Sequence, residues 1–266
     1  HQSFLPLILI YKNIILVYIY HKFVITFKII KINAIDSSNN EIKRLYNEKL
    51  HSNGLVIWAK NQTQGRGQGG KIWLSQPNKN LTFSIFLSGE NSYFSSPLSL
   101  NLIASISVKK VLACFGIKNI FIKWPNDILS VDKKISGILI ENLFKGKKLM
   151  GSIVGVGINV NQITFPENYN AISMKIIMKN VFSLKKVLHK FLDIFSHNII
   201  LYKDFELLIK DFNNSFYRKN ELSEYKIKGN SKRGKIIGLH DYERFQILNL
   251  NGLKETPKIT DIKIIY

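Results

Sequence analysis

The chain contains very little cysteine: Cys114 is its only one, so no disulfide can form within it. Cys114 lies in the apolar run of residues 111–115, where a free cysteine usually behaves as a small core hydrophobe, and we expect it to be buried. The six histidines show none of the spacings that bind a structural metal. A disulfide scaffold and a structural zinc site are therefore not expected.

Acidic residues are also scarce, because 18 Asp and Glu stand against 38 Lys and Arg and give a net charge of +20. Such an excess suits a nucleic-acid-binding protein, since clustered cations bind phosphates. The lysines, however, are spread along the whole chain and accompany frequent Ile, Asn, Phe and Tyr, the residues that an AT-rich coding sequence favours. We rank compositional drift first and keep a non-catalytic basic nucleic-acid-binding protein as an alternative.

The N-terminal region has no uninterrupted apolar run of membrane-spanning length. Residues 4–20 are apolar apart from Lys12 and Asn13, and no small-residue cleavage site follows them. We interpret residues 1–26 as an apolar N-terminal extension of uncertain status. Because every motif described below lies after it, we expect its removal to leave the activity intact.

The rest of the chain has the composition of a globular protein, with 45% hydrophobic and 21% charged residues. Strand and helix patterns mix over residues 27–222, which predicts an α/β (α+β) domain. Short β segments follow in residues 223–266 and predict a small β-barrel. The patterns place strands at 27–34, 54–60, 81–87, 120–124, 127–130, 136–142 and 149–160, and helices at 39–50, 97–115, 183–202 and 204–217. At the start of the first helix, Ser38 and Glu41 offer a capping box.

A glycine-rich segment runs from Gln62 to Trp73 and has four glycines in six positions, residues 65–70. Glycines let backbone amides close around a small ligand or phosphate, although a mobile surface loop is the ordinary interpretation of such richness. Arg66 between two glycines and Trp73 at the exit favour a loop that covers a ligand.

A second motif is the run Lys123-Trp124-Pro125-Asn126-Asp127, which by itself could be a turn. A two-residue hairpin loop at residues 131–132 would place Asp127 opposite Ser136, with Asp127 and Lys134 on one face as diagonal neighbours about 7–8 Å apart. Asp127 between Lys123 and Lys134 could be a structural ion pair. It could equally hold Mg²⁺ while the lysines bind phosphate and carboxylate oxygens.

A third motif, Gly155-Val156-Gly157-Ile158-Asn159, ends a strand, where its glycines permit close approach of a ligand or a neighbouring strand. Together, the GRGQ loop, KWPND, GILIE at 137–141 and GVGINV at 155–160 resemble the signatures of the biotin-protein ligase family. Residues 36–39, DSSN, are similar to its D-S-T-N element. The resemblance covers about residues 27–266.

The resemblance implies a mixed-sheet catalytic domain over residues 27–222, of the class II aminoacyl-tRNA synthetase-like, biotin–lipoate ligase type, and an SH3-like β-barrel over 223–266. It also implies a ligase that activates biotin with ATP to biotinyl-5′-AMP and transfers it to a lysine of a biotin carboxyl carrier protein. ATP and Mg²⁺ would be co-substrate and ion, with no tightly bound prosthetic group. We expect a cytoplasmic enzyme whose partner is the carrier domain of a biotin-dependent carboxylase, with no DNA or membrane partner and with a homodimer left open.

The same resemblance assigns residues to roles. Lys134, Arg66 and Lys123 are the expected catalytic cations, and Asp127 is the expected Mg²⁺ ligand. The expected ATP-binding residues are Arg66, Trp73, Lys123, Asn126, Lys134 and Asn159. Those expected to bind biotin are Ser37, Ser38, Asn39, Gln62, Gly65, Arg66, Gly67, Gln68, Lys134 and Gly137.

Two departures and one rival remain. The fourth loop position, often arginine in the family, is Gln68, and the fifth is Gly69, which leaves retention of the acyl-adenylate open. A lipoate-protein ligase of the same fold is the nearest enzymatic alternative. Its R-R-x-S-G-G-G type loop is absent, whereas the GRGQ loop and KWPND are present.

Overall fold

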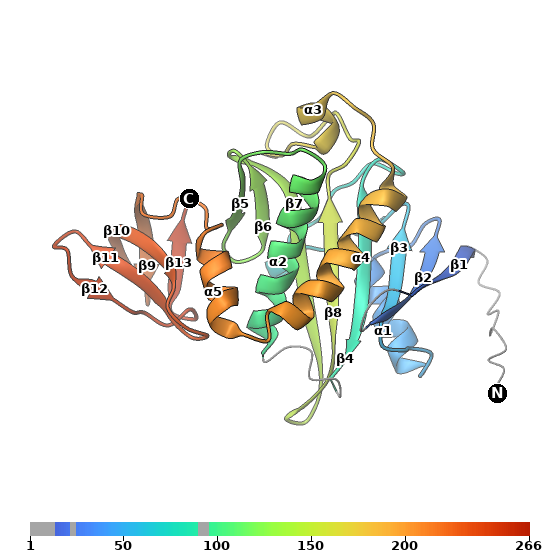
Figure 1. The fold of residues 1–266 in the computed structure, drawn as a ribbon, viewed down its shortest axis with the longest axis horizontal. Helices are drawn as coiled ribbons and strands as arrows, with labels where there is room; N and C mark the ends of the chain where they lie inside the picture. The colour runs from blue at the N-terminus through green and yellow to red at the C-terminus, as the bar shows by residue number, and fades with distance from the viewer. Residues whose placement is uncertain (1–13, 22–24, 90–95) are drawn as a thin grey trace.

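The computed structural model describes residues 14–21, 25–89 and 96–266. Within these ranges the chain forms one eight-stranded sheet covered by helices and a second sheet of five strands at the C-terminal end (Figure 1). The apolar stretch at residues 4–20 lies partly outside the described residues. Its described part, β1 (Ile14–His21), is the edge strand of the large sheet.

The large sheet has the order β1-β2-β3-β4-β8-β7-β6-β5. Only β2 and β3 pair in parallel and every other neighbouring pair is antiparallel, which confirms the expected mixed sheet. Most predicted strands exist, with ends shifted by a few residues. After β1 the strands are β2 (Thr26–Ile32), β3 (Leu55–Ala59), β4 (Leu81–Ser88), β5 (Ile120–Lys123), β6 (Asp127–Ser130), β7 (Lys133–Lys145) and β8 (Lys148–Ile158).

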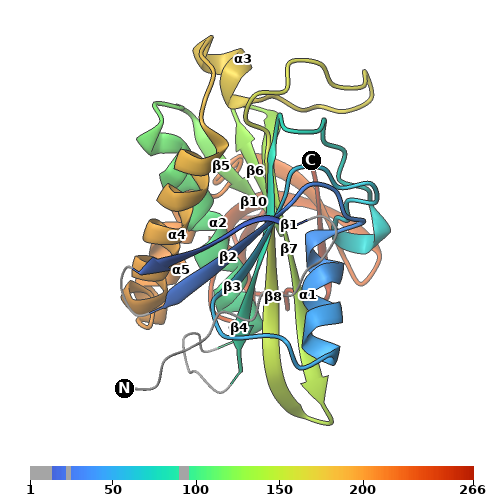
Figure 2. The same ribbon diagram turned by 90° about the vertical axis from the view of Figure 1, so that its right-hand side faces the viewer.

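Helices cover both faces of this sheet (Figure 2). On one face α2 (Pro97–Cys114), α4 (Leu184–Leu201) and α5 (Phe205–Asn213) bury the main hydrophobic core against the strands. On the other, α1 (Ser38–Asn47) closes a smaller cluster around Ile42 and Phe86. A short helix, α3 (Met174–Met178), was not predicted.

Two sequence-based expectations about the helices are wrong. Cys114 is exposed rather than buried, because in the last turn of α2 it is Val111 and Leu112 that face the core. The capping box at α1 does not form, since the N-cap residue is Ser37 and no side chain caps the helix. Ser38 turns its hydroxyl to Ser84 instead.

Helix α2 is long and apolar enough to cross a membrane by length and composition alone. However, 61% of that stretch is buried inside the protein. It packs against α4, α5 and the sheet, as the core helix of a globular domain does.

The second sheet is antiparallel, with the order β12-β11-β10-β9-β13. Its strands are β9 (Leu222–Ile227), β10 (Asn230–Leu239), β11 (Phe245–Asn249), β12 (Lys254–Glu255) and β13 (Ile262–Ile265). The edge strands β12 and β13 do not pair with each other, so the sheet is open and the expected closed barrel is not confirmed. Phe245 packs edge-on against Trp124 at 5.0 Å between ring centres, which joins this sheet to the main core.

Candidate functional site

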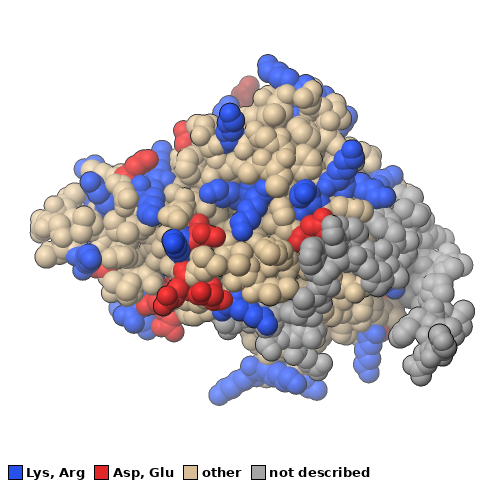
Figure 3. All heavy atoms as spheres, in the orientation of Figure 1, with Lys and Arg blue, Asp and Glu red and all other residues tan. Residues whose placement is uncertain are grey.

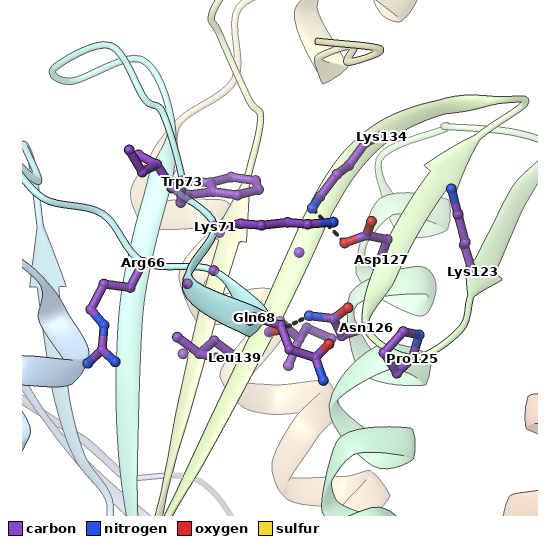
Figure 4. A pocket seen from close by; sticks show the side chains of 18 of the residues that line it. Arg66, Gln68, Lys71, Trp73, Lys123, Pro125, Asn126, Asp127, Lys134 and Leu139 are labelled. Atoms are coloured by element: carbon purple, nitrogen blue, oxygen red, sulfur yellow. Dashed lines mark hydrogen bonds and ion pairs between the residues drawn. The ribbon is translucent and has the colours of Figure 1, made fainter. Parts of the chain in front are cut away.

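A cavity of about 1190 Å³ opens where the glycine loop, the middle strands of the large sheet and β13 of the second sheet meet. Figure 4 shows the part of it that the loop and the large sheet form. Most of the residues that the sequence assigns to the site line it. They are Ser37, Ser38, Asn39, Gln62, Arg66, Gly67, Gln68, Trp73, Lys123, Asn126, Asp127, Lys134 and Gly137. The motifs are thus far apart in sequence but close in space.

The glycine loop folds back on itself as a small hairpin. The amide of Gly67 donates to the Lys71 carbonyl at 2.7 Å, and the amide of Trp73 donates to the Gly65 carbonyl at 2.9 Å. A Cβ on Gly65 would lie 2.3 Å from the Trp73 carbonyl oxygen, so only glycine fits this crossing. Gly65 therefore shapes the loop but does not line the cavity, contrary to its expected place in the biotin site.

The glycines of the third motif make room for two side chains of the site. A Cβ on Gly155 would come within 2.3 Å of Asn39 Oδ1, and one on Gly157 within 2.4 Å of the Trp73 indole. Gly137 lies under the same ring. The close approach that the sequence predicted is therefore made by Asn39 and Trp73, which form part of the wall and floor of the cavity.

Buried polar groups form that floor. Ser38 and Asn39, at the start of α1, are almost fully buried. The Ser38 amide donates to Gln62 Oε1 at 2.7 Å, and its hydroxyl lies 2.6 Å from the hydroxyl of Ser84. Ser84 on β4 donates in turn to Asn39 Oδ1 at 2.5 Å. A ligand that reaches this floor meets ordered hydrogen-bonding groups in surroundings of little water.

The opposite side of the cavity carries charge (Figure 4). Lys134 Nζ pairs with Asp127 Oδ1 at 2.6 Å, so the two side chains share one face as expected. The expected register was wrong by one residue: a bulge at Ile135 sets Asp127 opposite Gly137 instead of Ser136. Lys71 of the glycine loop also points toward Asp127 and Lys134.

Lys123 faces the same region from β5, directly across from Asp127. Its ammonium group lies 4.6 Å from the ring centre of Tyr266, just after β13. Burial lowers the pKa of Lys123 from its ordinary value; the charges of Lys134, Lys71 and Arg218 lower it further, and Asp127 opposes the shift only in part. A bound anion would raise the pKa of this lysine again.

Arg66 is not brought together with the two lysines. Its guanidinium points away from Lys134 toward α1 and β7, where it donates to Asn40 Oδ1 at 2.8 Å and lies 3.3 Å from Glu141 Oε1 (Figure 4). In this arrangement the charge of Arg66 is engaged by Asn40 and Glu141 and is not directed at the two lysines.

Asn159 also lies outside the cavity, contrary to its expected contact with the nucleotide. It is buried, and its amide donates to the carbonyls of Lys134 and Ile172 at 3.3 and 3.2 Å. Asn159 therefore supports the backbone that carries Lys134. The expected residue Asn126 does line the cavity, pinned by its amide to the Ile138 carbonyl at 2.7 Å.

Sequence reasoning missed several residues of the site. Ser84 looks like any small residue of a buried strand, and Glu141 was seen only as part of GILIE. Lys226 lies in the second sheet and Tyr266 directly follows its strand β13, and no local pattern connects either residue to the cavity. The one available signal was Lys71, the cation next to the last glycine of the loop.

Comparison with known proteins identifies relatives of this chain. Residues 32–159 match the model of the biotin/lipoate A/B protein ligase family. The bifunctional ligase/repressor BirA of Bacillus spizizenii is 35% identical over 144 residues, which are 53% of this chain and 43% of that protein. The biotin–protein ligase of Schizosaccharomyces pombe is 27% identical over 237 residues, 79% of this chain and 37% of that protein. The chain thus spans about two fifths of the length of these curated relatives.

Solved structures extend the match over both sheets. The biotin protein ligase of Aquifex aeolicus in complex with biotin and ATP is 30% identical, with a TM-score of 0.76, and the alignment covers 89% of this chain and 98% of that one. The Leishmania major enzyme, 19% identical with a TM-score of 0.60, shares the fold. The fold and the site thus define a member of the biotin and lipoate ligase class. Within that class, the chain belongs to the biotin protein ligase family.

Proposed function

We propose that this protein activates biotin with ATP, forming biotinyl-5′-AMP and pyrophosphate, and then transfers biotin to a lysine of a carboxyl carrier protein. The observation that carries the proposal is the two-sided cavity, with a neutral polar floor at Ser38 and Asn39 and a cationic side at Lys123 and Lys134. Biotin has a neutral ureido ring at one end and a carboxylate at the other, which matches this division. The complex of the Aquifex aeolicus relative with biotin and ATP supports the choice of ligands.

Activation requires an oxygen of the biotin carboxylate to attack the α-phosphorus of ATP while pyrophosphate leaves. Two anions must approach each other, so cations have to offset their repulsion in a site of reduced dielectric. In our proposal Lys134 lies between the carboxylate and the α-phosphate, and Lys123 binds phosphate. Lys71 is placed to assist. Arg66 would reach a phosphate only by leaving Glu141 and Asn40.

Transfer needs no covalent enzyme intermediate. The carrier amine attacks the acyl carbon of the adenylate, AMP leaves with the bonding electrons, and the amine loses a proton. Positioning of the two reactants and exclusion of water account for catalysis, with the glycine loop and Trp73 as the cover.

Asp127 is the proposed Mg²⁺ ligand. Mg²⁺ bound with a nucleotide commonly takes only one or two carboxylates, because phosphate oxygens and water complete its coordination shell. Among the described residues that line the cavity, Asp127 alone carries a side-chain carboxylate, and no cluster of three or more His, Cys, Asp and Glu occurs in the described ranges. Mg²⁺ held there would supply positive charge to the phosphates.

Finer features of the assignment are proposals as well. We place the catalytic unit, related to class II aminoacyl-tRNA synthetases, at residues 27–222 and an SH3-like unit at 223–266. The five short antiparallel strands support the latter. A cytoplasmic location and the carrier domain of a biotin-dependent carboxylase as partner follow from the proposed reaction, which leaves a homodimer open.

The decisive experiment is biotin-dependent exchange of labelled pyrophosphate into ATP. We expect exchange with biotin and Mg²⁺, and none with lipoate in place of biotin. If only lipoate supports exchange, the protein is a lipoate-protein ligase of the same fold and not a biotin ligase. On the face seen in Figure 3, Lys and Arg are scattered among other residues instead of forming one continuous patch, so this face offers no support for the rival nucleic-acid function.

A further inference from the structure

Glu141 lies outside the cavity, yet it contacts two residues that line the cavity, Asn39 and Arg66, and also Lys43 of α1. Its Oε1 atom is 2.7 Å from Lys43 Nζ and 3.3 Å from Arg66 Nη2, and its Oε2 accepts from Asn39 Nδ2 at 2.8 Å. Its side chain is 18% exposed. A carboxylate in such surroundings is a strong, acceptor-only anchor.

Glu141 fixes which way the amide of Asn39 points. Because a carboxylate can only accept, the NH₂ group of Asn39 faces Glu141 at 2.8 Å, where it also donates to the Leu139 carbonyl at the longer distance of 3.4 Å, and its Oδ1 faces Ser84. Ser84 then donates its single hydroxyl proton to that oxygen at 2.5 Å. Ser84 has no second proton, so in its 2.6 Å contact with Ser38 it must accept and Ser38 must donate.

The result reaches the cavity at Ser38. With its own proton committed to Ser84, the Ser38 hydroxyl has only lone pairs left for a ligand. Gln62 is ordered in the same way: its Oε1 accepts from the Ser38 amide, which leaves its NH₂ group for other partners. The floor therefore offers an acceptor at Ser38 and a donor at Gln62.

We propose that Glu141 is a positioning and specificity-determining residue, which orders this chain of hydrogen bonds so that Ser38 accepts an N–H group of the bound ligand. This inference rests on the proposed function, in which the ligand is biotin and the N–H belongs to its ureido ring. Lys43 and Arg66 keep the carboxylate ionised. Burial works to raise the pKa of Glu141, but the hydrogen bonds from Lys43 and Asn39 and the charges of Lys43 and Arg66 outweigh burial and lower it.

The Glu141→Gln variant tests the direction of this series of hydrogen bonds. A glutamine has one oxygen for Lys43 and Arg66 and must turn its NH₂ group toward Asn39. Asn39 then flips, Ser84 accepts from Asn39 and donates to Ser38, and the Ser38 hydroxyl presents its proton to the cavity. The variant should thus lose its preference for a ligand N–H at this point.

The measurement compares the Kd of biotin with that of its two cyclic carbamate analogues, in each of which one ureido N–H is replaced by a ring oxygen. In the parent protein we expect one analogue to bind about tenfold more weakly than biotin, the value of one hydrogen bond. In Glu141→Gln that ratio should fall toward one. Ser84→Ala interrupts the series of hydrogen bonds while leaving Glu141 in place, so it should lower the ratio as well. It is the second test if Glu141→Gln folds poorly.

The matched control is Glu255→Gln. Glu255 on β12 also pairs with a lysine, Lys232 at 3.1 Å, and accepts from an asparagine, Asn249 at 3.1 Å, but it does not line the cavity. This variant should keep the parent ratio. Equal weakening of biotin and both analogues in Glu141→Gln, or a parent protein that does not distinguish them, would overturn the inference. Absence of biotin-dependent exchange in the parent would instead overturn the proposed function.

Discussion

At the scale of single residues, the site depends on where a few charges are placed. Lys134, Asp127 and Lys123 project from the β5–β6–β7 part of the sheet, and Lys134 and Asp127 are only partly exposed. Partly exposed ion pairs contribute little to folding, on the order of 0–1 kcal/mol. Substitution of these residues should therefore change chemistry more than stability.

Lys134→Ala should lower adenylate formation by about 10²- to 10³-fold, the usual effect of removing one group that stabilises the transition state. The melting temperature should change little, because Lys134 is at the surface end of a hairpin. Lys133→Ala is the matched control, since its exposed side chain precedes Lys134 on the same strand. Pyrophosphate exchange is the measurement. Equal exchange rates for the two variants would show that Lys134 takes no part in the reaction.

Lys123 predicts a pH dependence. Because its pKa lies below the ordinary 10.5, the neutral form becomes populated at a lower pH than for a free lysine. Neutral lysine does not bind phosphate well, so the KM for ATP should rise as pH increases from neutral toward that value. Lys123→Arg keeps its charge throughout and should flatten this rise. If the KM for ATP rises with pH in the same way in both proteins, a group other than Lys123 causes the rise.

Gln68 is neutral at the loop position where the family resemblance leads us to expect an arginine. It is exposed, and Lys71 already points to the cationic side of the cavity. A charge-assisted hydrogen bond exceeds a neutral one by about 1–2 kcal/mol, so Gln68→Arg should slow release of biotinyl-adenylate by about tenfold. Stopped-flow release is the measurement, with the carrier-saturated transfer rate as the internal control. Unchanged release would mean that other contacts, such as those of Lys71, hold the loop.

At the scale of elements, the glycines of β7 and β8 let other parts of the chain approach the sheet. Trp73 comes from a loop more than eighty residues before Gly157, and the indole rests directly on the backbone of that glycine. The glycine loop is in this way attached to the sheet by packing as well as by the contact of Arg66 with Glu141. The position of the cover depends on both attachments.

Gly157→Ala should displace Trp73, because the new Cβ would lie 2.4 Å from the indole. We expect weaker binding of biotin and ATP with a changed indole fluorescence, and partial recovery in the double variant with Trp73→Leu, whose smaller side chain relieves the overlap. Gly146→Ala is the control, since nothing lies within 4 Å of its new Cβ and only its positive φ is strained. Unaltered ligand affinity in Gly157→Ala would show that the loop adjusts freely.

At the scale of the whole molecule, the site depends on contacts between distant parts. The second sheet lines the cavity with Lys226 and the run from Ile262 to Tyr266. At the other end of the large sheet, β1 is separated from the cavity-lining strand β4 by β2 and β3. The two ends of the described chain should therefore differ in their importance for activity.

Removal of residues 1–24 should preserve biotin-dependent exchange per folded molecule and lower the melting temperature. The activity is kept because β1 is remote from the cavity, and stability falls because β2 loses its hydrogen-bonded neighbour and becomes an exposed edge. The cut stops before Ile25, which is fully buried. Scanning calorimetry and the exchange assay on both proteins test this. A folded but inactive truncated protein would place the N-terminal strand in the catalytic unit.

The local pattern of the sequence determined the order of strands and helices, the glycine loop, and the residue types that gather at the site. Hydrophobic periodicity and glycine content are local properties, so they can be read without the fold. The hairpin at residues 131–132 even placed Lys134 and Asp127 on one face correctly. The same reasoning could not foresee the bulge at Ile135, which shifts the register by one residue, or the outward turn of Cys114.

Only the tertiary structure decided the partners of each side chain. Arg66 could bind a phosphate or a protein carboxylate, and the packing of α1 and β7 placed Glu141 and Asn40 within its reach. Asn159 could face a ligand, but its side-chain amide donates to backbone carbonyls instead. Ser84, Glu141 and Tyr266 joined the site because strands far apart in the chain became neighbours. A hydrogen bond or ion pair depends on distances of a few ångströms between such residues, and these distances exist only after the sheets have packed.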